Sequence, residues 1–175
     1  MRNLFANGGH LLLRGEAVRV AGGFFPGMAY GEDWEFWIRI ALQGPFAALG
    51  SRTPVLFVRQ CAAGAYRRLA SDPAAFAPCM AAIFGNPVLL ARFGPRRLAA
   101  IRRRTEAENQ WIIGRELIRG GKDADGRAWL RRSVLAAPTA KRAALLAAAH
   151  VLPLLPPRLR GPFRAYRLLE QPTLP

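Results

Sequence analysis

Helix-start and helix-stop signals dominate this chain after residue 70 and constrain its fold more than any other feature. Two of them are an acid or amide followed by proline, Asp72-Pro73 and Asn86-Pro87, which supply an N-cap and a residue preset for the first helical position. Apolar periodicity predicts three longer helices, over about 95–119, 125–137 and 139–152. Gly120-Gly121 and Pro138 end the first two. No strand pattern follows residue 60, so residues 71–175 are predicted to form a helical extension.

One segment within the predicted helical part resembles a known helical hairpin. The segment "GGKDADGRAWLRRSVLAAP" is similar to the second helix of a tetratricopeptide-like hairpin, with Gly126 and Ser133 at positions usually occupied by alanine. We therefore expect one such hairpin around 106–138. A single unit does not form a solenoid, because repeats need neighbours to bury their faces. The string Asp123-Ala124-Asp125 lacks a preceding apolar strand, so we interpret Asp123 as part of an interhelical turn or a helix cap and predict no metal site there.

The first part of the chain, residues 1–70, has a different pattern. "GHLLLR" and "TPVLFVRQ" are typical of strands, while "GEAVRVAGG" is typical of a short helix that ends at a glycine pair. Together with the later helices, these segments predict an α/β fragment followed by a mostly α-helical extension, mainly α by residue count. The two predicted parts are therefore 1–70 and 71–175.

Charge and cysteine usage narrow the function classes. The net charge is +15, and 24 of the 26 basic residues are arginine, but no aromatic residues alternate with the arginine clusters as in a base-stacking surface. Nucleic-acid binding is therefore disfavoured, and anionic lipid headgroups are the better partner. The arginines that flank the apolar tail are Arg158, Arg160, Arg164 and Arg167. Cys61 and Cys79 lack metal-site spacing and are expected to be ordinary buried thiols.

No apolar run reaches the length of a membrane span, and no signal peptide is recognised. We therefore expect a cytoplasmic protein, with peripheral contact at the inner membrane as a second expectation.

The stretch "AYGEDWEFWIRIA" places two adjacent carboxylates at the start of an amphipathic helix, predicted over 33–43. Trp34, Trp37, Ile38 and Ala41 fall on its core-facing side, whereas Glu35 and Arg39 fall opposite, in the favourable order for an ion pair. Glu32 and Asp33 occupy the first positions, where backbone N–H groups and the helix dipole stabilise negative charge. A carboxylate that stays ionised there can accept a proton.

Residues 14–44 resemble the acceptor-side segment of family 2 glycosyltransferases, which are inverting enzymes with an A-type α/β fold. The matching residues, in order, are Arg14, Gly22, Gly23, Phe24, Glu32, Asp33, Trp34, Trp37 and Arg39. The resemblance implies that Asp33 is the general base that removes a proton from an acceptor hydroxyl. It further implies acceptor-binding roles for Glu32, Trp34, Gly23 and Phe24, and nucleotide diphosphate-binding roles for Arg59, Tyr66 and Arg67.

The chain departs from the family in three places. Phe25-Pro26 follows Gly-Gly-Phe where members often have Asp or Asn, and Cys61 stands near the position of a common histidine. The resemblance begins almost at Met1, so the nucleotide-binding half with its Asp-x-Asp metal motif is not part of it. A divalent metal, Mg or Mn, is expected for the parent family, but its ligands are not in this chain.

Two functions from different classes follow from the sequence. The first is transfer of a sugar from a nucleotide-diphosphate donor to a glycan, lipid or protein acceptor, with inversion, in cell envelope polysaccharide synthesis. We expect the chain to be inactive without a donor-binding half. The alternative is a non-catalytic helical adaptor or remnant that binds a partner or an anionic membrane surface.

Overall fold

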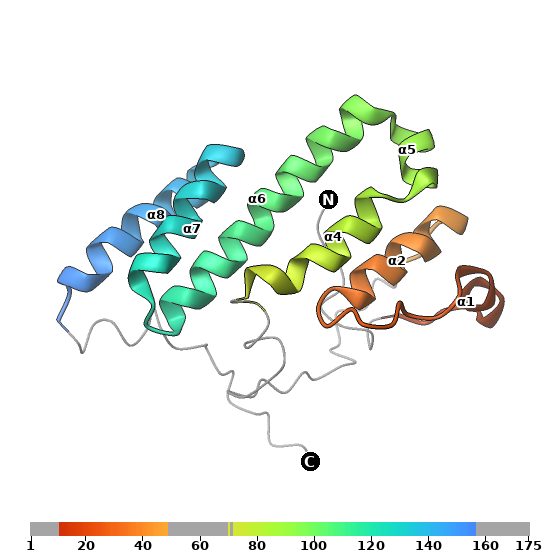
Figure 1. Ribbon diagram of the computed structural model, residues 1–175, viewed down its shortest axis with the longest axis horizontal. Helices are drawn as coiled ribbons and strands as arrows, with labels where there is room; N and C mark the ends of the chain where they lie inside the picture. The colour runs from red at the N-terminus through yellow and green to blue at the C-terminus, as the bar shows by residue number, and fades with distance from the viewer. Residues whose placement is uncertain (1–10, 49–69, 71, 157–175) are drawn as a thin grey trace, which may run out of the picture.

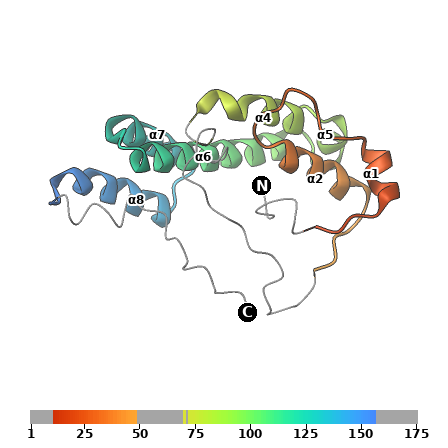
Figure 2. The same ribbon diagram turned by 90° about the horizontal axis from the view of Figure 1, so that it is seen from below.

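The computed structural model describes residues 11–48, 70 and 72–156, and the regular elements in this part of the chain are helices. The N-terminal helices are α1 (Gly15–Ala21) and α2 (Glu32–Gln43). The others are η2 (Pro73–Phe76), α4 (Ala77–Phe84), α5 (Pro87–Phe93), α6 (Pro95–Arg119), α7 (Asp123–Ala136), α8 (Ala140–Val151) and η3 (Leu152–Leu154). Helix α6 runs through the middle of the molecule (Figure 1), and α4 and α8 lie on opposite sides of it (Figure 2).

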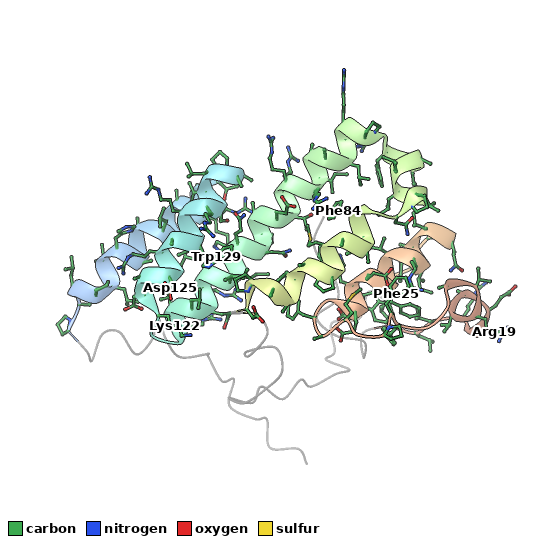
Figure 3. All side chains as sticks on the ribbon, viewed as in Figure 1. Arg19, Phe25, Phe84, Lys122, Asp125 and Trp129 are labelled. Atoms are coloured by element: carbon green, nitrogen blue, oxygen red, sulfur yellow. The ribbon has the colours of Figure 1, made fainter. Side chains whose placement is uncertain are left out.

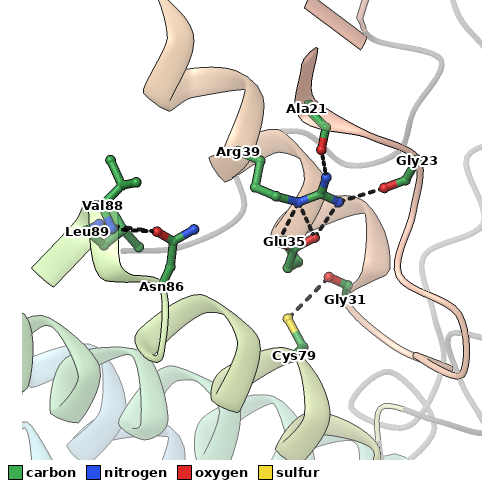
Figure 4. Close-up of polar contacts among 9 residues, drawn as sticks. All are labelled: Ala21, Gly23, Gly31, Glu35, Arg39, Cys79, Asn86, Val88 and Leu89. Carbon is green, nitrogen blue, oxygen red and sulfur yellow. Dashed lines mark hydrogen bonds and ion pairs between the residues drawn. The ribbon is translucent and has the colours of Figure 1, made fainter. Parts of the chain in front are cut away.

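The predicted helix caps form as expected. The Asp72 carboxylate accepts a hydrogen bond from the Ala74 N–H at 2.9 Å, and the Asn86 side chain accepts one from the Val88 N–H at 2.9 Å (Figure 4). Thr139, which the sequence placed inside the last long helix, instead caps α8 by accepting the Arg142 N–H. Each cap satisfies a donor that the first turn of a helix leaves without an intrahelical partner. Helix α6 begins at Pro95 and ends at Arg119, before Gly120, as these helix-start and helix-stop residues led us to predict.

Helices α6 and α7 form an antiparallel pair that depends on small residues. A Cβ atom added at Gly114 would lie 2.8 Å from the Gly126 carbonyl oxygen, and one added at Gly126 would lie 2.5 Å from Ile118 Cγ1. The buried Ser133 hydroxyl donates to the Ala107 carbonyl at 2.6 Å. These contacts bring the two backbones closer than larger side chains would allow.

Helix α2 is buried on two sides. Trp34 packs with residues of α4, α5 and α6, in a core cluster that consists of Trp34, Cys79, Met80, Ile83, Leu89 and Leu98. Phe36, Trp37 and Ile40 form a second cluster against α1 and the segment before it. Of the four residues on the predicted stripe, Trp34 and Trp37 are buried, Ile38 is half-buried and Ala41 is exposed. The buried surface of α2 is therefore wider than the stripe.

The α/β prediction is wrong for the part of the chain that the structure describes. Within residues 11–48, 70 and 72–156 there is no strand, and the mainly helical character alone agrees with the sequence. Residues 11–14 alternate between half-buried and exposed, as in a strand, but Leu11 and Leu13 pack on the side chains of α2. A strand requires a neighbouring strand to take up its backbone hydrogen bonds. The segment "TPVLFVRQ" lies outside the described residues.

The division at residue 70 stays a prediction. Residues from both sides of it share a core, because Trp34 of α2 packs with Cys79 and Met80 of α4. In the described ranges, no helix taken singly has both the length and the apolar character of a membrane span. The consecutive segments Pro73–Phe84 and Pro87–Phe93, bent by 63° at their junction, satisfy both criteria together.

Candidate acceptor site at the start of α2

The Arg39 side chain connects the turn at Gly22-Gly23, which follows α1, to helix α2. Its guanidinium pairs with the Glu35 carboxylate, with Nε 2.7 Å from Oε1 and Nη2 2.8 Å from Oε2. The same guanidinium donates to the carbonyl oxygens of Ala21 and Gly23, the latter at 2.8 Å (Figure 4). The predicted ion pair is therefore present, although Glu35 is only 2 % exposed and not on an open face. One side chain thus fixes the position of the turn that leads into the candidate site.

Two phenylalanines of the same loop, Phe24 and Phe25, also contact side chains of α2. The Phe24 ring lies 4.7 Å from the Phe36 ring and 6.3 Å from the Trp37 ring, in tilted and edge-on arrangements. The Arg39 guanidinium lies 4.6 Å from the centre of the Phe25 ring, which Figure 3 labels beside α2. Aromatic and cation–π contacts of this kind favour one conformation of the loop. Phe24 nevertheless keeps 53 % of its surface exposed, so it is available to a ligand.

Glu32 and Asp33 open helix α2, and both are half-buried. Gly31 precedes them in the left-handed region, with φ 77°, and its carbonyl accepts the Glu35 N–H at 3.0 Å. The Asp33 carboxylate accepts the N–H of Trp34. The first turn therefore concentrates three acidic residues, Glu32, Asp33 and Glu35, where the helix dipole stabilises negative charge.

Helix α4 contacts the residue that precedes these carboxylates. The Cys79 thiol donates to the Gly31 carbonyl at 3.2 Å, and a Cβ atom at Gly31 would lie 2.6 Å from Cys79 Sγ. Burial, followed by the negative charges of Glu35, Asp33 and Glu32, raises the pKa of the Cys79 thiol to about 12. Cys79 is therefore the inert buried thiol that the sequence predicted, whereas Cys61 lies outside the described residues.

The turn before α2 is held by a second aromatic contact. The Tyr30 ring lies 4.4 Å from the Phe76 ring of η2, and both belong to a cluster with Ile113 and Leu117 of α6. The start of α2 is therefore supported by α1 through Arg39, by α4 through Cys79 and by α6 through Tyr30. Such support from several rigid elements is what a precisely placed catalytic group requires.

The structure brings most of the predicted acceptor-side residues together, but in different environments. Asp33, Glu32, Gly23 and Phe24 all lie on α2 or on the loop attached to it. Trp34 points into the core instead and is 8 % exposed, so its contact with α4 supports the site from below. The residues expected to bind the nucleotide diphosphate, Arg59, Tyr66 and Arg67, lie outside the described residues. The assigned roles stay predictions.

Sequence reasoning missed the burial of Glu35 and of Phe36 with Ile40. A one-sided helical stripe puts Glu35 on the solvent side, but Glu35 is buried and paired with Arg39, and α1 packs on Phe36 and Ile40. The available signal was the apolar content of α2: Phe36 and Ile40 lie outside the stripe, and a helix that is apolar on more than one side is buried on more than one side.

No metal site is apparent in the residues that the structure describes. No group of three His, Cys, Asp or Glu side chains among them is arranged to hold a metal ion. Asp123 and Asp125 lie in the first turn of α7, beside a shallow hollow of about 470 Å³ that Lys122, Arg127 and Pro153 also line (Figure 3). The Mg or Mn ion of the parent family stays an expectation, and no chemical step is assigned to it.

Comparison with known proteins gives no relatives. No protein-family model, no curated protein and no solved structure matches the chain.

Proposed function

We propose that this chain supplies the acceptor side of an inverting glycosyltransferase, with Asp33 as the general base. The single observation that carries the proposal is the placement of Asp33. It is a half-buried carboxylate in the first turn of α2, beside a loop that Arg39 fastens to the same helix. A base must be ionised, accessible and held in place, and these features favour all three.

In the proposed reaction, the acceptor hydroxyl oxygen attacks the anomeric carbon of a nucleotide-linked sugar. The bond between that carbon and the phosphate oxygen breaks, and the nucleoside diphosphate leaves with the electron pair. The hydroxyl proton moves to the Asp33 carboxylate as the new C–O bond forms. Attack from the face opposite the leaving group inverts the configuration of the anomeric carbon.

The neighbouring residues have separate proposed roles. Glu32 and the exposed part of Phe24 would shape the acceptor site, since a sugar ring packs well on an aromatic face and hydrogen-bonds to a carboxylate. Gly23 would let the acceptor approach the backbone, because no atom lies within 4 Å of a Cβ added there. Arg39 would be a positioning residue, since its guanidinium is engaged with Glu35, Ala21 and Gly23.

A second function, a helical adaptor, is favoured by a different observation. The described part of the chain is helical, and its tightest contact is the glycine- and serine-based packing of α6 on α7. Such hairpins commonly present a surface to partner proteins. The adaptor predicts partner binding that does not depend on the Asp33 carboxylate.

The test is acceptor-dependent release of nucleoside diphosphate from a panel of nucleotide sugars. It is made on the polypeptide encoded by the whole reading frame that contains this chain, including any coding sequence upstream of Met1. Turnover that Asp33→Asn reduces by about 100-fold or more supports the proposal, because a positioned general base contributes about 10²–10⁴ to the rate. Turnover unaffected by Asp33→Asn, or no turnover with any donor, contradicts it.

A further inference from the structure

The junction of α5 and α6 combines exposed aliphatic side chains with exposed arginines. We call it the α5–α6 corner and define it by Val88, Leu90, Arg92, Arg96 and Arg103. It lies at the end of α6 remote from the turn to α7 (Figure 1). We propose that the α5–α6 corner docks on an anionic lipid bilayer. The proposal does not rest on the glycosyltransferase function.

The first argument is the exposure of aliphatic side chains on a short protruding helix. Val88 is 53 % and Leu90 47 % exposed, whereas Leu89 between them is 2 % exposed and anchors α5 in the core. Helix α5 therefore touches the rest of the molecule along one side and presents aliphatic groups on the others. Side chains of this kind can enter the boundary between headgroups and acyl chains, which gives interfacial helices much of their affinity.

The second argument is the distribution of charge. From Pro73 to Thr105 the sequence contains six arginines and no acidic residue. Arg96 and Arg103 are seven residues apart and project from the side of α6 opposite the buried Leu98 and Thr105. A bilayer with anionic lipids attracts such unneutralised basic groups and repels acidic ones.

The third argument is that these arginines are not used inside the described structure. The ion pairs between described residues use other arginines; Glu106, for example, pairs with Arg102 at 2.8 Å. Arg97 differs from its neighbours because its guanidinium lies 5.2 Å from the centre of the Phe93 ring. Arg92, Arg96 and Arg103 form no ion pair with the carboxylates of the described residues. They are therefore available to lipid phosphates.

The same surface disfavours the other polyanions. Nucleic-acid sites combine basic groups with exposed aromatic faces for base stacking, but the exposed apolar groups of the corner are the aliphatic Val88 and Leu90. Spanning the bilayer is disfavoured as well. The α4 half of the bent apolar pair contributes Cys79, Met80 and Ile83 to the core, so α5 alone is free to enter a lipid surface.

The test is co-sedimentation of the full chain with vesicles of phosphatidylcholine alone or of equimolar phosphatidylcholine and phosphatidylglycerol. Binding to the anionic vesicles that weakens steeply with added salt supports the proposal. The triple variant Arg92→Ser, Arg96→Ser, Arg103→Ser is expected to lower the partition coefficient about tenfold or more. Equal binding to both vesicle types, or binding to single-stranded RNA without binding to vesicles, overturns the proposal.

Two matched controls separate the corner from general charge and hydrophobicity. Arg19→Ser, Lys122→Ser, Arg131→Ser removes three exposed charges elsewhere and is expected to change the partition coefficient by less than about twofold. Val88→Ser, Leu90→Ser is expected to weaken binding about tenfold, and Leu135→Ser, Val151→Ser, which alters exposed aliphatic residues of α7 and α8, is not.

A third comparison tests the arginines of the C-terminal tail. If Arg158→Ser, Arg160→Ser, Arg164→Ser abolishes vesicle binding while the corner variants bind normally, the tail and not the corner is the docking surface. Loss in the corner variants but not in their matched controls supports the proposal. All the changes lie at exposed positions or outside the described residues, and circular dichroism checks that each variant keeps its helical content.

Discussion

The guanidinium of Arg39 donates a hydrogen bond of 2.8 Å to the carbonyl oxygen of Gly23, sixteen residues earlier in the chain. The same group forms an ion pair with Glu35, which is buried. A buried carboxylate is tolerated only when it is paired and hydrogen-bonded. The pair therefore has two structural roles. It stabilises the packing of α1 on α2, and it holds the glycine loop beside Asp33.

Removal of the guanidinium should destabilise the protein strongly. Arg39→Ala leaves the Glu35 carboxylate buried without its partner and frees two backbone carbonyl groups. We expect the free energy of unfolding, measured with urea, to fall by about 3 kcal/mol or more. The control is Arg102→Ala, which breaks the exposed pair with Glu106 and should cost less than about 1 kcal/mol. Equal losses in the two variants would show that the Arg39 network is not a structural support.

Gly31 should tolerate a methyl group less well than Gly27. Both glycines have positive φ, 77° and 78°, so alanine is strained at either position. Only at Gly31 would the new Cβ meet another side chain, Cys79 Sγ at 2.6 Å, whereas nothing lies within 4 Å at Gly27. We expect Gly31→Ala to cost about 3 kcal/mol and Gly27→Ala about 1 kcal/mol in urea unfolding. A partial rescue of Gly31→Ala by Cys79→Ala would assign the difference to the thiol, and the absence of any difference would contradict this packing.

Protein stability should fall at alkaline pH because of Cys79. Burial and the neighbouring carboxylates raise the pKa of this thiol from 9.0 to about 12 in the folded protein. Above pH 9 the unfolded chain therefore loses the proton before the folded chain does, and the free energy of unfolding decreases until about pH 12. The comparison is made in a Cys61→Ala background, so that Cys79 is the only thiol that differs. In that background, the decrease should be smaller when Cys79 is also replaced by alanine. Identical pH profiles would contradict the burial of the thiol.

The contact between α6 and α7 should not tolerate a larger residue at Gly126. Alanine is normally the better helix former, but its Cβ would lie 2.5 Å from Ile118 Cγ1 and 2.8 Å from the Gly114 carbonyl oxygen. We expect Gly126→Ala to lower the melting temperature, with a loss of about 2 kcal/mol. Gly44→Ala, where nothing lies within 4 Å, should leave the melting temperature nearly unchanged. An unchanged or raised melting temperature for Gly126→Ala would contradict the close helix approach.

Local signals in the sequence predicted the helical part of the fold well. Asp72 and Asn86 became caps, and α6 begins at Pro95 and ends at Arg119, just before Gly120-Gly121, because caps and breakers act through the adjacent backbone. The Glu35–Arg39 pair was also predictable, since residues four apart on a helix are neighbours. These features depend on contacts within a few residues.

The features that the sequence did not predict depend on contacts between residues far apart in the chain. The alternation at residues 11–14 is real, but whether such a segment forms a strand depends on a hydrogen-bonding neighbour far along the chain. Likewise, the burial of Phe36 and Ile40 depends on α1, which packs on a side of α2 outside the stripe. The candidate site was predictable as a motif around Asp33, but its support by Cys79 and Tyr30 was not, since neither residue belongs to that motif.

The most direct test of the central claim is the rate of nucleoside diphosphate release by the Asp33→Asn variant of the whole reading frame, with nucleotide sugar and acceptor present. Asparagine keeps the shape of the side chain and removes the proton-accepting carboxylate, so the rate should fall by about 100-fold or more while the helical content is unchanged. Asp125→Asn, which changes an exposed acid of α7, should keep the normal rate. A normal rate in Asp33→Asn, or an equal loss in Asp125→Asn, would contradict the assignment of Asp33 as the base.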